Sequence, residues 1–394
     1  MTNATLLKTL QQYDCDVRNI FFSPDGLLFA PIPSDGGCIS FYYTSTGDLQ
    51  STTANYDEMI WDIQFSSDAK FVLTAYDDGI ARLCSTETGE LVREFTDVSE
   101  DGYERMFAAV FTPDGENIIT GTDIVQVWDI HTGELEQSLL GTGDRDNLPV
   151  ASPEAMANVI MDSHEIWSLG FSPDNKFLIS TSSKTATLRL WDTRTWTLRF
   201  ETHGRSLSFS PDGKTFVTAG GANGIQLWDL ETLTVHQTFQ GGSPRFSPDG
   251  KIIATGAASH KINLWDVETG DFKHALCGYG TNMPSILFTP NSQTLVSNAG
   301  RIVHIWDIAT GRLEYLLEDH ERLIHNFVLA PAGNVLATGS RDHSVRLWDI
   351  ETGVCLQVLE GHEDEVYGVQ FSPDGSRLVT SSEDGRVFLW KIEQ

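Results

Sequence analysis

The chain has 394 residues, of which 40% are hydrophobic and 21% charged, an ordinary composition for a globular protein with a buried core. The charge is unusual, because 26 Lys and Arg residues stand against 55 Asp and Glu residues, which gives a net charge of −29. Since a surface this negative repels phosphate backbones and anionic lipids, we expect no nucleic acid and no membrane as partner, and positively charged partners are favoured.

The N-terminal segment MTNATLLKTLQQYDCD lacks the long apolar run of a signal peptide, and no later segment approaches the length that spans a membrane. The five cysteines show no C-x-x-C spacing, which argues against a disulfide framework and a zinc site and favours a reducing compartment. We therefore expect a soluble, cytoplasmic protein, or a nuclear one if it acts as a corepressor.

A repeated turn sequence, FSPDG, is the strongest pattern in the chain, with an average step of about 44 residues. Pro presets a turn conformation and Gly accepts a positive φ, so each copy predicts a hairpin between two apolar strands. A second mark, Trp-Asp or a relative of it, follows each turn. The nine copies begin at Phe22, Phe65, Phe111, Phe171, Phe209, Phe246, Phe288, Leu329 and Phe371.

The segments between these marks are rich in β-forming residues with nearly alternating apolar and polar positions, as in RLVTSS and SVRLWDI. Each unit is therefore predicted to form a four-stranded antiparallel sheet, or blade. One such sheet cannot bury both of its faces, so neighbouring sheets must stack. The Trp in the third strand is expected to fill the space between them.

The two recurring marks make the whole chain resemble the WD-repeat (WD40) β-propeller family, which implies an all-β fold with blades around a central channel. We expect one propeller domain over residues 1–394 with nine blades, or eight if the degenerate first unit forms no blade of its own. The resemblance implies a protein-binding scaffold. It also implies a structural Asp–His–Ser/Thr–Trp hydrogen-bond network, which matches only the last two units: His320, Ser340, Asp342 and Trp348, and His362, Ser382, Asp384 and Trp390. The middle blades lack this set, so we expect them to be the least stable.

One insertion interrupts the repeat at about 139–165, where a start signal at Ser152-Pro153-Glu154 favours a short helix. At the C-terminus the last unit stops after its third strand. The segment Leu6–Gln12 has the layout of a fourth strand and is predicted to complete that blade, which would protect an open sheet edge and close a complete, monomeric ring.

Enzyme motifs are absent: the sequence has no G-x-x-x-x-G-K-[ST], G-x-G-x-x-G, G-x-S-x-G or H-E-x-x-H. The segments GGANG and DRDN are better explained as loops than as phosphate or calcium sites. We therefore predict no catalytic residues, no metal and no cofactor. The alternative, a propeller hydrolase or lyase, would need carboxylates or histidines converging in the channel.

The predicted binding site lies on the loops that lead into each innermost strand, by resemblance the usual partner-binding face of the family. Six of these loops are acidic, and the position four residues before the FSPDG-like turn is often aromatic. Rings beside carboxylates suit Lys or Arg side chains of a partner. The competing explanations are that the acidic loops only keep the protein soluble and that the rings pack beneath the loops. The predicted site comprises Trp61, Phe107, Trp167, Tyr367, His325, Arg18, Asp16, Asp57, Glu58, Glu104, Glu165 and Glu365.

The sequence thus favours a non-catalytic scaffold that docks a protein or peptide with a Lys/Arg-rich or mixed contact segment. A sensor or regulatory module of a larger signalling or corepressor-type assembly is the alternative, since the chain also loosely resembles the propellers of Groucho-type corepressors. Both interpretations place the functional surface on the same loops.

Overall fold

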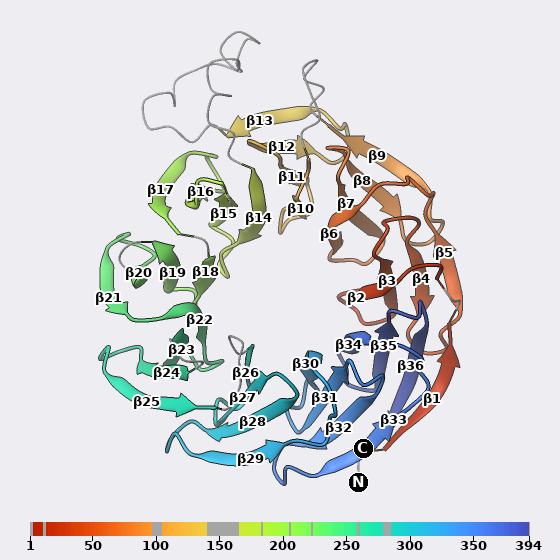
Figure 1. Cartoon of the computed structure of the whole chain (residues 1–394). Coiled ribbons are helices and arrows are strands. Elements are labelled where there is room, and N and C mark those ends of the chain that lie inside the picture. The colour runs from red at the N-terminus through yellow and green to blue at the C-terminus, as the bar shows by residue number, and fades with distance from the viewer. Residues whose placement is uncertain are drawn as a thin grey trace. The chain divides into compact units, whose positions relative to one another are not determined.

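The computed structural model describes residues 3–10, 13–96, 105–139, 165–182, 184–204, 206–221, 224–257, 261–278 and 285–393. Within these ranges the chain forms 36 β-strands and no helix. The strands assemble into nine four-stranded antiparallel sheets, each with its strands in sequential order except the last (Figure 1). The predicted all-β class and nine blades are confirmed, and the degenerate first unit forms a blade of its own. The insertion predicted at 139–165, with its short helix, lies outside the described residues apart from its two end residues.

The described chain divides into two compact units, which we treat separately. Unit 1 comprises Met1–Asp57, Thr86–Gly89 and Gln240–Gln394. Its strands, blade by blade, are β2 (Val17–Phe22), β3 (Leu28–Pro33), β4 (Ser40–Tyr43) and β5 (Leu49–Thr52); β22 (Gly242–Phe246), β23 (Ile252–Ala257), β24 (Lys261–Asp266) and β25 (Phe272–Cys277); β26 (Ile286–Phe288), β27 (Thr294–Ala299), β28 (Ile302–Asp307) and β29 (Leu313–Leu317); β30 (Ile324–Leu329), β31 (Val335–Ser340), β32 (Val345–Asp349) and β33 (Cys355–Leu359); and β34 (Val366–Phe371), β35 (Arg377–Ser382), β36 (Val387–Glu393) and β1 (Asn3–Thr9).

Unit 2 comprises Glu58–Ser85 and Glu90–Phe239. Its strands, blade by blade, are β6 (Ile60–Phe65), β7 (Phe71–Tyr76), β8 (Ala81–Ser85) and β9 (Leu91–Phe95); β10 (Ala108–Phe111), β11 (Asn117–Gly121), β12 (Val125–Asp129) and β13 (Leu135–Leu139); β14 (Ile166–Phe171), β15 (Phe177–Ser182), β16 (Thr187–Asp192) and β17 (Leu198–His203); and β18 (Ser206–Phe209), β19 (Thr215–Gly221), β20 (Gly224–Asp229) and β21 (Val235–Phe239).

The FSPDG-like turns join the first and second strands of each blade, as predicted. In the first of them the Ser23 hydroxyl donates to Asp25 at 2.6 Å and accepts the Leu28 N–H at 2.9 Å. Gly26 takes a φ of 69°, a left-handed conformation that favours glycine. The motif therefore acts locally, by fixing a tight turn through its own side chains. The same hydroxyl bond recurs at Ser66, Thr112, Ser172, Ser210, Ser247, Thr289 and Ser372.

The third-strand tryptophans lie between blades, as the stacking argument requires. Trp128 of β12 is buried against Leu73, Leu83 and Phe95 of the preceding blade. Each of the seven tryptophans also donates its indole N–H to a hydroxyl of the second strand in its own blade. This bond ties the large side chain to one position in the sheet. The hydroxyls are those of Thr120, Ser180, Thr218, Thr255, Ser297, Thr338 and Thr380.

The N-terminal strand completes the last blade, as predicted, because β1 pairs antiparallel with β36. Its bounds differ from the predicted Leu6–Gln12: the strand runs from Asn3 to Thr9, and residues 11–12 lie outside the described ranges. The reason is the length of β36, whose last residues extend the sheet edge. Ala4 pairs there with Ile392, and Asn3 with Glu393.

The hydrogen-bond network of the last two blades is present, with one correction. His320 Nδ1 lies 2.7 Å from Asp342, and its Nε2 lies 2.7 Å from Thr338 Oγ1, which also accepts the Trp348 indole N–H at 2.9 Å. The hydroxyl that joins the two rings is therefore that of Thr338, not of Ser340. Ser340 lies two residues further along β31, where its hydroxyl donates to backbone carbonyl oxygens and accepts the Asp342 N–H.

The ninth blade repeats the two bonds to the hydroxyl, but its His362 Nδ1 lies 3.7 Å from Asp384, longer than the 2.7 Å between His320 and Asp342. Thr380 Oγ1 bonds to His362 Nε2 at 2.8 Å and to the Trp390 indole at 3.1 Å. Ser382, which the sequence favoured, accepts the Asp384 N–H instead. In both blades the indole and the imidazole reach back along the second strand, so they meet the hydroxyl two residues before its end.

Acid should weaken the last blade through Asp384. Burial opposes ionisation of this carboxyl group, but the adjacent His362 and the N–H groups of Glu363 and Arg386 outweigh it and lower its pKa to about 2. A pKa below the ordinary value of 3.8 means that the folded state favours the carboxylate. Its contribution of about 2 kcal/mol is therefore complete above about pH 5 and is lost as the pH falls towards 2.

Urea denaturation at pH 7 and at pH 2.5 measures this effect. Asp384→Asn should be less stable than the natural chain at pH 7 and should lose less stability on acidification. Equal losses in the two proteins would show that Asp384 does not contribute to the acid sensitivity.

Candidate functional site

Five of the predicted binding residues lie in the same kind of backbone irregularity, which redirects their side chains. In five blades the innermost strand carries a β-bulge at the position four residues before the FSPDG-like turn. An extra residue in a bulge disrupts the ladder locally and redirects a side chain. The sequence pattern gave the position but not the bulge. The bulged residues are Arg18, Trp61, Trp167, His325 and Tyr367.

Three of the predicted aromatic residues form one cluster in unit 2. Phe107 and Trp167 stack with ring centroids 4.9 Å apart and an interplanar angle of 10°. Trp61 meets both rings edge-on, at 5.1 Å from Phe107 and 6.0 Å from Trp167. Phe107 is only 7% exposed and Trp167 is 47% exposed. The cluster therefore has a buried base and an exposed outer ring, so the alternative that these rings only pack beneath the loops does not hold for Trp167.

Hydrogen bonds to a carboxylate hold this cluster in place. Asp77 accepts the Trp61 indole N–H at 2.9 Å and forms a 3.1 Å ion pair with Arg105. Asp62, next in the strand, is half-buried and accepts the Ala109 N–H at 3.3 Å. Burial raises the pKa of Asp62. These hydrogen bonds thus connect Trp61 to β7 through Asp77, and β6 to β10 through Asp62. Trp167 packs against the residues that they hold.

The other predicted residues form a second, more polar cluster in unit 1. The Arg18 guanidinium lies 5.3 Å from the centroid of the Tyr367 ring and 2.5 Å from the carboxylate of Asp16. His325 stacks at an angle on Tyr367, with centroids 4.5 Å apart, and its Nε2 lies 2.8 Å from Glu365. Within this cluster, the Tyr367 ring already contacts Arg18 and His325. The carboxylates of Asp16 and Glu365 are already bonded to Arg18 and His325.

The carboxylates of this second cluster are engaged inside the protein. Glu365 also pairs with Arg341. Burial opposes its ionisation, yet the bonds to His325 and Arg341 lower its pKa. The Tyr367 hydroxyl donates to Glu365 and Glu383, and burial together with these two negative charges raises the pKa of Tyr367. Asp16 and Glu365 are therefore less available to a basic partner than the sequence suggested.

The remaining predicted acids take several positions. Asp57 is exposed, with a φ of 54°, and Glu58 is half-buried. Glu165 is also half-buried, and its N–H donates to Asp123 at 3.2 Å. Glu104 lies outside the described residues. The predicted residues thus lie in two groups, an aromatic cluster in unit 2 and a polar cluster in unit 1.

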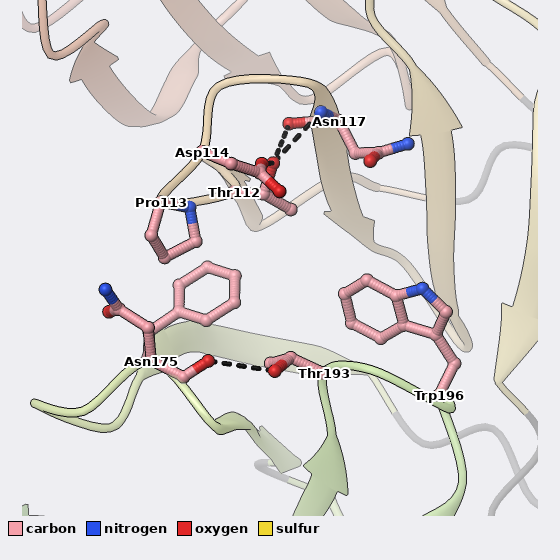
Figure 2. Close-up of a pocket in the computed structure, with 8 residues that line it drawn as sticks. Thr112, Pro113, Asp114, Asn117, Asn175, Thr193 and Trp196 are labelled. Atoms are coloured by element: carbon pink, nitrogen blue, oxygen red, sulfur yellow. Dashed lines mark hydrogen bonds between the residues drawn. The ribbon is translucent and has the colours of Figure 1, made fainter.

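A pocket of about 450 Å³ at the turn end of unit 2 was not predicted (Figure 2). Trp196 lines it, in the place where most repeats have the Gly of the Asp-x-x-Thr-Gly turn, and holds a φ of 53°. On the opposite side of the pocket, Asp114 accepts the Thr112 hydroxyl at 2.6 Å (Figure 2). On the same side as Trp196, Thr193 donates to the Asn175 carbonyl oxygen at 2.8 Å (Figure 2). An aromatic residue at a glycine position is the sequence signal that could have found this pocket.

Among the residues that the structure describes, no group of three or more His, Cys, Asp or Glu side chains could hold a metal ion. The same ranges contain no helix long and apolar enough to cross a membrane.

Comparison with known proteins places the chain in a family. The crystal structure of the computationally designed Ika8 protein is similar to it with a TM-score of 0.60 and 22% sequence identity, over 98% of this chain and 99% of the other. This likeness concerns the fold alone. No curated protein matches. The family described as WD domain, G-beta repeat (WD40) matches residues 47–85, 158–192, 195–229, 232–266, 311–349 and 353–391, which together make up more than half of the chain. The chain therefore belongs to the WD40 repeat family.

Proposed function

We propose that this chain is a non-catalytic protein–protein interaction scaffold whose unit 2 docks a peptide or protein segment on the Trp61–Phe107–Trp167 cluster. WD40 propellers typically serve as interaction scaffolds. The observation that carries the finer proposal is Trp167, a large ring that is 47% exposed and stacked on a buried one. A rigid, exposed aromatic side chain with a buried support is typical of the anchors that dominate protein interfaces.

The partner we propose presents Lys or Arg side chains. The chain carries a net charge of −29, which attracts cationic segments and speeds their association at low salt. The exposed part of the Trp167 indole offers a cation–π contact to such a side chain. Tryptophan forms stronger cation–π contacts than tyrosine or phenylalanine. Glu58, in the loop before Trp61, is the acid that we assign to the rim of this surface. We also propose a cytoplasmic location and a monomeric chain.

A labelled Lys-rich peptide, with a Gln-rich peptide of equal length as reference, tests this proposal by fluorescence anisotropy. The Lys-rich peptide should bind the natural chain, and Trp167→Ala should weaken binding by about 30-fold, equivalent to about 2 kcal/mol. Charge reversal at Glu58 should instead lower the association rate, chiefly at low salt.

Tyr43→Ala is the matched control, because Tyr43 is a similarly exposed aromatic residue (43%) outside the cluster. It should leave binding unchanged. Equal affinity of Trp167→Ala and the natural chain would overturn the proposed surface. Hydrolytic turnover that a single substitution abolishes would overturn the non-catalytic part.

A further inference from the structure

A second pocket, in unit 1, differs chemically from the aromatic cluster. It has a volume of about 480 Å³ and is formed by the innermost strands β22, β26 and β30 of three successive blades, together with Gly256 of β23. This volume is within the range of sites that hold small molecules. Its polar lining residues are Ser243, Arg245, Ser285, His325 and Asn326.

The lining contains hydrogen-bond donors and one permanent cation, but no Asp or Glu. In a chain with 55 acidic and 26 basic residues, a pocket lined without a carboxylate is unexpected. The nearest carboxylate that the described contacts identify is Glu365, bonded to His325, and its charge is opposed by the ion pair with Arg341. The electrostatic environment of this pocket therefore favours an anion more than the surface around it does.

Arg245 is the residue on which this chemistry depends. Its side chain is exposed and forms no ion pair or hydrogen bond with any residue that the structure describes. Arg82 and Arg189 differ, since they are buried and pair with Glu94 at 3.0 Å and Glu201 at 2.7 Å. The Arg245 guanidinium thus retains its planar set of N–H donors, which match the oxygens of a carboxylate or phosphate group.

The backbone beside Arg245 is irregular in a way that positions it. The register of β22 shifts between Gly242 and Arg245, and Ser243 holds a φ of 48°. Pro244, which cannot donate to the sheet, is accommodated in this bulge. On the next blade, the Ser285 N–H donates to Asn298 at 3.2 Å. Bulges and strained residues concentrate at sites where side chains are redirected towards a ligand.

The lining also contains three apolar residues, Ile286, Leu287 and Phe327. Ile286 packs against one inter-blade core, and Leu287 and Phe327 against the next. A fitting ligand therefore has an anionic end for Arg245 and a small apolar body for the parts of Ile286 and Leu287 that remain accessible. We propose that the pocket is a binding site for a small organic anion, with a carboxylate or phosphate on an apolar body. This proposal does not depend on the docking surface in unit 2, because the two involve different residues in different units.

Isothermal titration with phenyl phosphate and with benzoate tests the proposal and distinguishes the two anionic groups. At least one of them should bind, and benzyl alcohol, which lacks the charge, should bind at least about tenfold more weakly. Arg245→Gln should weaken the anion by at least about tenfold, and Arg245→Lys by less, because lysine keeps the charge but not the planar donor set.

Arg312→Gln is the matched control, since Arg312 is an exposed arginine of unit 1 that does not line the pocket. It should bind like the natural chain. Asn326→Asp provides a second, independent variant that places a carboxylate in the pocket, and it should abolish binding of both anions. Absence of binding for both anions at millimolar concentration, or equal affinity in Arg245→Gln, would overturn the site.

Discussion

Deleting residues 1–10 should destabilise unit 1 by on the order of 5 kcal/mol, because it removes a whole strand with its backbone hydrogen bonds. The strand β1 pairs with β36 from Asn3 opposite Glu393 to Thr9 opposite Phe388. Ala4 is buried, and its N–H and C=O bond to the Gln357 side chain at 2.7 and 2.8 Å. Without β1, the edge of β36 is open to water and to pairing with other chains.

Hydrogen exchange measured by mass spectrometry locates this effect. Peptides from β36 should lose protection in the truncated chain, while peptides from β16 in unit 2 should keep theirs. Lys8→Ala is the control, since it removes only the exposed ion pair with Asp48 and should cost less than about 1 kcal/mol. If the truncated chain kept its melting temperature and its protection at β36, the N-terminal strand would not support the last blade.

Thr338→Val should destabilise the protein by about 3 kcal/mol, although the two side chains have nearly the same shape. The Thr338 hydroxyl bonds to both His320 and Trp348, and all three residues are at most 1% exposed. Valine leaves the imidazole nitrogen and the indole N–H buried without a partner, and each unsatisfied group costs about 1–3 kcal/mol. Chemical denaturation measures the loss.

Two comparisons separate this effect from a simple change in packing. Thr338→Ser keeps the hydroxyl and should lose about 1 kcal/mol for the missing methyl group. Thr218→Val in a middle blade should cost less than Thr338→Val, because the Thr218 hydroxyl accepts only the Trp228 indole among the described side chains. Equal stability of Thr338→Val and Thr338→Ser would contradict the role that we assign to this hydroxyl.

Arg245 and Trp196 show where sequence reasoning stopped. Arg245 lies in β22 directly before an FSPDG turn, and Trp196 lies in the turn that follows the third strand of its blade. The surroundings of both depend on residues from other blades. The pocket around Arg245 needs β22, β26 and β30 side by side, and the pocket beside Trp196 needs the turns of two blades. A repeat pattern indicates which positions are equivalent in successive blades, but not which side chains of adjacent blades leave space between them.

The sequence by itself determined the class of the protein, the number of blades and the strand that completes the last blade. These properties follow from local turn chemistry and from a Trp at a fixed distance after each turn, both of which recur in the chain. The tertiary structure alone decided that Thr338 rather than Ser340 joins His320 to Trp348, because the imidazole and the indole reach back along β31 to the Thr338 hydroxyl. It also decided that Trp167 stacks on Phe107, while Glu365 is engaged by His325 and Arg341. Whether a charged or aromatic residue is free to bind a partner depends on neighbours that the fold supplies from other blades, and these neighbours are not encoded in the local pattern.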